Sequence, residues 1–201
     1  KHYPVVGNNN INATFTGCFY ADGSTNDVPI LGGIAPFPLY NNSDNSTTLD
    51  EYNQTTNHIL LSQRTLYTDG NWNTLCLPFD IPAPSGADHT STPLSPIAGA
   101  KVMTLASTQY ADGTLTLYFE EVNSIEAGKP YIVRWNPTIS GNLPNPVFLN
   151  ATVSNTDNPI TTTHADFIGN FSPLTITPDD PSHLYLGASN TLYYPTTDRK
   201  S

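Results

Sequence analysis

The sequence predicts an all-β protein: a mainly antiparallel β-sandwich, jelly-roll or immunoglobulin-like, with about ten or more strands. Strand-length segments with alternating apolar side chains recur along the chain, and turn residues separate them. The 201 residues include 18 Pro and 13 Gly, and no long window repeats its apolar residues at the helical period of about 3.6. The best helical candidate is a short turn at residues 123–126.

The predicted strands are half-buried, because their apolar side chains alternate with polar ones. In residues 114–119, Leu115, Leu117 and Phe119 face inward, and residues 131–135 repeat the pattern. The other predicted strands are residues 11–20, 58–61, 64–67, 101–107, 147–153, 166–171, 184–186 and 192–194.

Turn chemistry between these segments predicts hairpins. The motif Tyr-x-Asp-Gly begins at Tyr20, Tyr67 and Tyr110, and Asp-Gly between strands favours a tight turn because Gly tolerates positive φ. Ser189 and Asn190 predict another tight turn between the last two strands.

Residues 70–81 combine a Trp, a Cys and several large apolar side chains, which is typical of a strand in the centre of a β-core. We therefore expect Trp72 and Cys76 to be structural. The predicted core side chains are Trp72, Leu75, Cys76, Leu77, Phe79, Leu117, Phe119 and Trp135.

The chain is predicted to form a single domain over residues 1–201, with residues 1–52 as an alternative N-terminal extension or extra β layer. Two segments rich in small polar residues or Pro, residues 36–57 and 82–96, are predicted to be surface loops.

The charge balance excludes a nucleic-acid reader, because a net charge of −10 with 7 Lys and Arg provides no basic face for phosphates. Binding to an anionic membrane surface is excluded for the same reason, because it also needs a basic face. No apolar run is long enough to span a bilayer. The acidic, Asn- and Thr-rich composition suits a secreted or cell-surface protein. Acceptor patterns for N-glycosylation begin at Asn12, Asn41, Asn45, Asn53, Asn150 and Asn170.

Catalytic signals are weak, and we assign no catalytic residue, cofactor or metal ligand. Most carboxylates lie in predicted turns, although Asp179 and Asp180 together could hold Ca²⁺. The five His residues lack metal-ligand spacing. Cys18 and Cys76 are expected as unpaired thiols, with a disulfide between them as the alternative. The aromatic side chains expected at an exposed binding surface are Tyr40, Tyr52, Tyr193 and Tyr194.

One series of segments resembles a known family when the segments are taken together and in order. They are residues 64–67, 69–79, 112–117, 126–133, 167–169, 184–188 and 192–195, and they include Asp-Gly-Asn-Trp-Asn-Thr-Leu-Cys-Leu-Pro-Phe and Glu-Ala-Gly-Lys-Pro-Tyr-Ile-Val. The series resembles a β-rich domain near the C-terminus of secreted and surface proteins of Bacteroides- and Prevotella-type bacteria, some of them leucine-rich-repeat adhesin-like.

The resemblance implies a β-sandwich, a surface or secreted location, no known catalysis, and a Cys76 without a fixed partner. It also implies a short aromatic strand after the Tyr-Tyr-Pro segment. In this chain that segment is followed by residues 196–201, so the last strand was either left out or removed. Our hypothesis is that its removal would leave an open sheet edge that can accept a strand from another chain.

The sequence therefore predicts a non-catalytic binding or adhesion module, with a glycan or a host or bacterial surface protein as its partner. The alternative is a subunit of an extracellular filament that assembles by strand exchange. A carbohydrate-active hydrolase is the third and least favoured interpretation.

Overall fold

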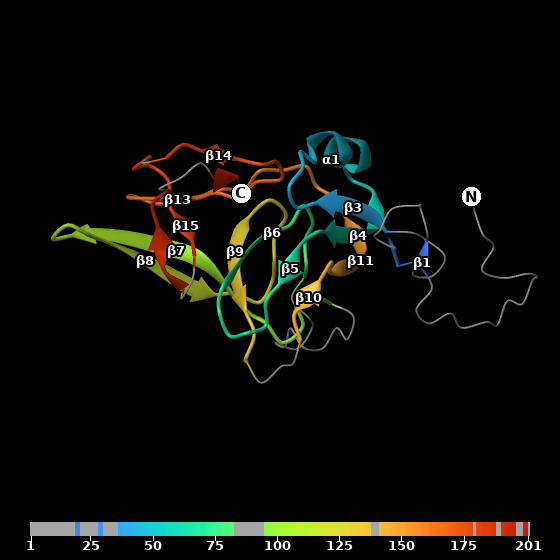
Figure 1. Cartoon of the computed structure of the whole chain (residues 1–201), viewed down its shortest axis with the longest axis horizontal. Helices are drawn as coiled ribbons and strands as arrows, with labels where there is room; N and C mark the ends of the chain where they lie inside the picture. Colours follow the sequence, from blue (N-terminus) through green and yellow to red (C-terminus); the bar gives the residue numbers. More distant parts are fainter. Residues whose placement is uncertain are drawn as a thin grey trace, which may run out of the picture.

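The structure is a computed structural model that describes residues 19–20, 28–29, 36–82, 95–137, 141–178, 180–187, 190–195 and 199–200. Within these ranges the chain is mostly β, with small and mostly antiparallel sheets and one short helix (Figure 1). The predicted strands between residues 58 and 194 each overlap an observed strand, so the mostly β prediction is confirmed. The predicted strand at residues 11–20 and the predicted loop at residues 82–96 lie largely outside the described residues.

The largest sheet has four strands in the order β6-β9-β7-β8, and all neighbours are antiparallel. Its strands are β6 (Asn73–Cys76), β7 (Lys101–Ala111), β8 (Thr114–Glu121) and β9 (Pro130–Arg134). Val102 and Val133 are Cα partners and are fully buried on one face of this sheet. Because side chains alternate along a strand, Lys101 and Arg134 must lie on the opposite face.

The second sheet has three strands in the order β11-β4-β3: β3 (Phe37–Tyr40), β4 (Thr56–Ser62) and β11 (Val147–Thr152). β11 runs antiparallel to β4, whereas β3 runs parallel to it. A parallel pair needs a crossover, and α1 (Ser46–Tyr52) supplies it. The prediction of a surface loop at residues 36–57 was therefore wrong. Leu39 and Leu49 are buried in the core, and their burial outweighs the loop-like composition around them.

Asn45, the residue before α1, anchors the helix to two other segments. Its side-chain oxygen accepts a hydrogen bond from the Tyr40 amide (2.9 Å), and its Nδ2 donates to the carbonyls of Tyr40, Ser43 and Phe171. Asp44 accepts hydrogen bonds from the Ser46 amide and the Ser172 hydroxyl. Because the Asn45 amide is buried and fully engaged, it is not accessible for glycosylation in the folded chain, although its sequence pattern fits.

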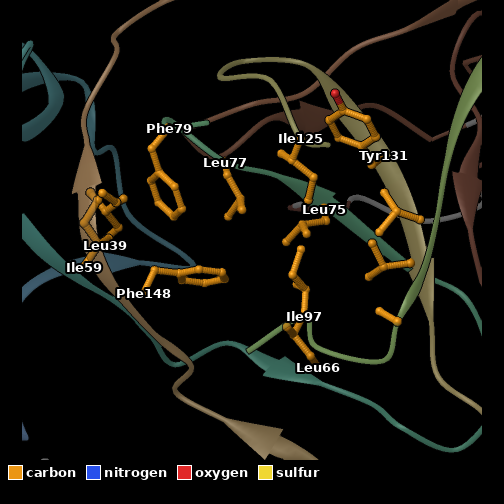
Figure 2. Packing of buried hydrophobic residues seen from close by; sticks show 14 of the residues in the cluster. Leu39, Ile59, Leu66, Leu75, Leu77, Phe79, Ile97, Ile125, Tyr131 and Phe148 are labelled. Atoms are coloured by element: carbon orange, nitrogen blue, oxygen red, sulfur yellow. The ribbon is translucent and has the colours of Figure 1, made fainter. Parts of the chain in front are cut away.

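Both large sheets contribute to one hydrophobic core (Figure 2). The rings of Phe79 and Phe148 meet at 5.0 Å, and isolated bridges join Phe79 to Val153 and Ile81 to Ile125. Residues 123–126 therefore extend the β structure at Ile125, and the prediction of a helical turn there was wrong. The core is lined by Leu39, Leu49, Ile59, Leu66, Leu75, Leu77, Phe79, Ile97, Val102, Ile125, Tyr131, Val133, Trp135, Phe148 and Val153.

The C-terminal third adds a layer of very short strands. These are β12 (Ile160–Thr161), β13 (Asp166–Phe167), β14 (Thr175–Ile176), β15 (Tyr185–Leu186), β16 (Leu192–Tyr193) and β17 (Arg199–Lys200). β12 pairs with β13, β14 with β17, and β15 with β16. The remaining two-residue strands are β1 (Phe19–Tyr20), which pairs with β2 (Val28–Pro29), and β5 (Thr65–Leu66), which pairs with β10 (Leu143–Pro144).

This C-terminal layer covers part of the outer face of the four-stranded sheet. The ring of Phe167 meets that of Phe119 edge-on at 5.9 Å. Gly169 lies so close to Cys76 that an added Cβ would be 2.3 Å from its sulfur. In Figure 1 β13 lies beside β7 and β8, and the Thr108 hydroxyl contacts that of Thr162 between β12 and β13 at 2.7 Å, while α1 and β3 lie at the other end of the molecule.

The predicted turns have different outcomes. Asp112 and Gly113 both have positive φ (50° and 77°), as a type I′ turn requires, and the β7–β8 hairpin is confirmed. β15 and β16 also form a hairpin, with Asn190 at positive φ. The motif at Tyr67 does not form a hairpin, because β5 pairs with β10 and not with β6. The residues after Tyr20 lie outside the described ranges.

Among the described residues, no helix is long and apolar enough to cross a membrane.

Candidate functional site

The outer face of the four-stranded sheet carries Trp72, which directly precedes β6, beside Arg134 of β9 and Lys101 of β7. Arg134 and Lys101 are Cα partners, and Trp72 directly precedes the pair of Asn73 and Val133. The Arg134 guanidinium carbon lies 4.6 Å from the centroid of a Trp72 ring, which is a cation–π distance. Trp72 is half-buried and is not part of the core cluster, so its predicted core role was wrong. It lies on the face opposite to the core, where Arg134 covers it.

The segment around Trp72 is hydrogen-bonded to the tip of the β15–β16 hairpin. The Trp72 amide donates to Oδ1 of Asn190 (2.8 Å), and Nδ2 of Asn190 donates to Oδ1 of Asn71 (3.3 Å). Asp69 in turn accepts a hydrogen bond from the Asn71 amide, which lowers the pKa of Asp69 below its ordinary value. Two segments far apart in sequence are thereby held together.

The β15–β16 hairpin presents aromatic rings to solvent. Tyr193 is 40% exposed and Tyr194 is 56% exposed. The Tyr193 ring stacks on that of Tyr185, with centroids 5.8 Å apart and planes inclined by 27°. Gly187 packs against the same ring, because a Cβ there would lie 2.6 Å from Cδ2 of Tyr193. The Tyr193 ring is thus packed on one side while part of it stays accessible.

The other two predicted binding residues lie elsewhere. Tyr40 is 43% exposed at the end of β3. Tyr52 is half-buried at the end of α1, with its ring stacked on that of Phe37 at 4.5 Å, and so offers little free ring surface. Figure 1 places β3 and α1 at the opposite end of the molecule from β15, so the structure does not bring the four Tyr residues together.

Three residues of interest were missed at the sequence level. Tyr110 and Tyr118 are exposed on the β7–β8 hairpin, where the Tyr118 hydroxyl donates to Oε1 of Gln109 (2.9 Å). Arg134 lies within a strand whose apolar side chains dominate its pattern. The alternation of residues 131–135 places it opposite to Val133, and this signal could have identified its outward position.

The remaining predicted core residues divide between the two faces of the sheet. Leu75, Leu77, Phe79 and Trp135 are buried, and Nε1 of Trp135 donates to the carbonyl of Ala98. By contrast Cys76, Leu117 and Phe119 are half-buried on the outer side.

Cys76 is a free thiol beneath the C-terminal layer. Burial, with a smaller contribution from the negative charge of Asp157, raises the pKa of this thiol to about 12. Its thiol is therefore protonated at neutral pH and poorly nucleophilic. Cys18 lies outside the described residues.

Two acidic side chains of the four-stranded sheet and the turn after it form local ion pairs. Glu121 pairs with Lys101 at 3.0 Å, and Glu126 pairs with Lys129 at 2.9 Å. No group of three or more His, Cys, Asp or Glu side chains is placed to hold a metal ion within the ranges that the structure describes.

Asp180 was considered as a calcium ligand, and its carboxylate is occupied by neighbours. It accepts hydrogen bonds from the Ser182 hydroxyl and amide and contacts Nδ1 of His183 at 2.7 Å, and these contacts lower its pKa. Ser182 contacts the same ring nitrogen of His183, so the three side chains do not have the relay geometry of a Ser-His-Asp triad. Asp179 lies outside the described residues.

Comparisons with protein-family models, with curated proteins and with solved structures found no match to this chain.

Proposed function

We propose that this chain is a non-catalytic binding module of a secreted or cell-surface protein, and that it contacts glycans through an aromatic surface made of Trp72, Arg134, Asn190, Tyr193 and Tyr194. The observation that carries this proposal is the hydrogen bond from the Trp72 amide to Asn190. It joins the hairpin with the exposed Tyr rings to the segment where Arg134 stacks on Trp72. Aromatic rings pack against the apolar faces of sugars, while amide and guanidinium groups hydrogen bond to sugar oxygens.

The local contacts that order the side chains of this surface support a binding role. The Tyr193 ring is supported by Tyr185 and Gly187, and the Trp72 backbone is fixed by Asn190. Side chains that are already ordered lose little entropy on binding, which favours recognition by a shallow surface. The surface and secreted location draws support from the acidic composition and from the resemblance described above.

We also propose that the three-stranded and four-stranded sheets are the two layers of a β-sandwich. Side chains of both sheets meet in one core, with Phe148 of β11 packed against Phe79 and with Val133 of β9 in the same cluster. In this arrangement the aromatic surface lies on the side of the four-stranded sheet that faces away from the core.

A glycan array followed by titration of the strongest ligands tests the binding proposal. Tyr193→Ala and Tyr194→Ala are expected to weaken binding about tenfold each, since a stacked aromatic contact contributes roughly 1 kcal/mol or more. Tyr110→Ala is the control, because Tyr110 is at least as exposed as Tyr193 and Tyr194 but lies on the β7–β8 hairpin. Equal losses in all three variants, or no binding to any glycan, would contradict the proposal.

A specific observation also favours the strand-exchange function. β8 is an edge strand of the four-stranded sheet, and its residues 114–119 (Thr-Leu-Thr-Leu-Tyr-Phe) contain no charge and no Pro. Natural edge strands usually carry charged residues or Pro, which prevent pairing with another chain. In this second candidate function, β8 of one copy pairs with a strand of another copy during assembly.

Light scattering coupled to size-exclusion chromatography, over a wide range of concentrations, tests assembly. The wild-type chain is expected to form dimers or larger species at high concentration, and Thr116→Lys is expected to keep the chain monomeric by adding a charge to the edge. Thr152→Lys, on an exposed position of β11, is the control. A monomer at every concentration rules out this second function.

A further inference from the structure

Arg134 differs from the other cationic side chains that the structure describes. Lys101 and Lys129 each form an ion pair with a Glu. Arg64 is half-buried and donates to the carbonyl of Thr74 at 2.7 Å. Arg134 is exposed, has no carboxylate partner among the described residues, and rests on the indole of Trp72.

The Trp72 ring limits how the Arg134 guanidinium can be arranged. A guanidinium is planar, and stacking on an aromatic face leaves its N–H edges available for hydrogen bonding. Two parallel N–H groups on such an edge match the two oxygens of a carboxylate, or two oxygens of a sulfate group. Asn190 accepts a hydrogen bond from the Trp72 backbone amide, so the backbone that carries the indole is tied to the β15–β16 hairpin.

The neighbouring side chains suit an acidic sugar. Lys101, the Cα partner of Arg134 on the adjacent strand, lies on the same face, although its charge is paired with Glu121, so among the described residues Arg134 carries the unpaired charge there. The hairpin whose tip binds Trp72 carries the exposed rings of Tyr193 and Tyr194. A ligand with its acidic group on Arg134 and a sugar ring against the Tyr hairpin would use both parts of the aromatic surface.

The acidic character of the whole chain shapes the binding of such a ligand. A net charge of −10 repels anions at long range, and salt screens this repulsion beyond roughly 8 Å at physiological ionic strength. The direct contact with Arg134 is shorter than that distance and is screened less. The affinity for an anionic ligand should consequently depend only weakly on salt, unlike that of a polyanion-binding protein with a basic face.

We propose that the Trp72–Arg134 pair binds the acidic group of an anionic saccharide and so determines which glycans the aromatic surface accepts. This inference rests on the proposed glycan-binding function and names its ligand class. Arg134 provides the bidentate hydrogen bonds, Trp72 positions Arg134, and the Tyr hairpin contacts the sugar rings. The acidic group is a carboxylate, as in a uronic acid, or a sulfate ester.

Titration calorimetry on the full chain, with three oligosaccharides of equal length, tests the inference. The ligands are an oligouronate, a sulfated oligosaccharide and a neutral oligosaccharide. The wild-type chain is expected to bind at least one acidic ligand about tenfold or more tightly than the neutral one. If the chain prefers the oligouronate and loses this preference below the pKa of the uronic acid, the bound group is a carboxylate. If it prefers the sulfated oligosaccharide and keeps this preference at low pH, the bound group is a sulfate.

Variants separate the role of Arg134 from a general charge effect. Arg134→Gln is expected to abolish the preference for the acidic ligand, and Arg134→Lys to lose most of it, because Lys keeps the charge but lacks the planar donor edge. Lys129→Gln, which also removes one positive charge, is expected to keep the preference. Urea unfolding of each variant verifies that it is folded. If Arg134→Gln does not fold, Arg134→Lys alone provides the test.

Tryptophan fluorescence gives an independent readout. The chain has two Trp residues, and Trp135 is buried on the core side, so a change on adding the acidic ligand reports on Trp72. Trp72→Phe is expected to remove that change.

If acidic and neutral ligands bind equally and Arg134→Gln changes nothing, this inference is wrong while the glycan-binding function stands. If no saccharide binds at all, both are wrong.

Discussion

Two glycines with the same unusual backbone conformation are expected to differ in what they tolerate. Gly113 and Gly128 have φ of 77° and 75°, but a Cβ at Gly113 meets nothing within 4 Å, whereas one at Gly128 would lie 1.8 Å from the carbonyl oxygen of Thr156. Gly128→Ala must therefore displace backbone, and we expect it to cost roughly 3 kcal/mol or more of unfolding free energy. Gly113→Ala carries only the conformational strain of about 1 to 2 kcal/mol.

Urea denaturation of both variants measures this difference. Similar unfolding free energies for the two variants would show that the turn near Thr156 adjusts without cost.

Asp44 is expected to make stability depend on pH in the acidic range. Its pKa is lowered from 3.8 to about 2, first by the hydrogen bond from the Ser172 hydroxyl and then by the bonds from Ser46. A group whose pKa is depressed on folding stabilises the protein above its unfolded pKa and loses that contribution as the pH falls through the folded value. The contribution of Asp44 should be complete above about pH 4 and vanish toward about pH 2.

Comparison of the wild-type chain with Asp44→Asn isolates this effect. The difference between their urea midpoints is expected to be constant near neutral pH and to shrink as the pH falls from about 4 to about 2. Asp166→Asn, which removes an exposed carboxylate from β13, is the control. A difference that does not change with pH would show that Asp44 acts without its charge.

At the level of elements, the strands could be predicted and the crossover could not. The alternation in β8 and β9 is strong because each of these strands has one face turned away from water. α1 is only seven residues long, and a single buried side chain, Leu49, holds it to the core. A helix this short leaves no detectable period, and tertiary contacts decide its formation.

The beginning of α1 is expected to depend on Asn45. Asn45→Ala leaves the Tyr40 amide without its partner in a partly buried setting and removes the two N–H donors that serve three carbonyls, so we expect a loss of roughly 2 to 4 kcal/mol. Asn45→Asp keeps the acceptor but turns a negative charge toward three carbonyls, and should be at least as harmful. Asn42→Ala, at an exposed neighbour, should change stability by no more than about 0.5 kcal/mol.

Chemical denaturation of the three Asn variants provides the measurement. A neutral Asn45→Ala would mean that water replaces the lost hydrogen bonds and that β3 and α1 are held by Leu39 and Leu49 alone.

The candidate site could be predicted only in part, because it is assembled from distant segments. The exposure of Tyr193 and Tyr194 follows from their place near a turn, and both were expected at the surface. The contact of Asn190 with Trp72 joins residues 118 positions apart, and no local pattern indicates it. Trp72 was expected in the core because Trp in a strand usually packs there, yet its face of the sheet is only partly covered.

For the whole molecule, the structure predicts that the core and the C-terminal layer differ in local stability. The core between the large sheets contains Phe148, which is buried and packed on Phe79. The C-terminal layer consists of strands of two residues, and Phe167 is only half-buried where it meets Phe119. Regions with few buried contacts open at lower free energy than the core, without global unfolding.

Hydrogen exchange of Phe148→Ala and Phe167→Ala tests this division. Phe148→Ala is expected to cost about 3 to 5 kcal/mol and to speed exchange throughout the slowest amides, those of β4, β7 and β9. Phe167→Ala is expected to cost less and to speed exchange only in β12 to β16, which would loosen the hairpin that carries Tyr193. If Phe167→Ala instead lowers protection equally in both large sheets, the C-terminal layer is an integral part of one cooperative unit. The aromatic surface would then be as rigid as the core.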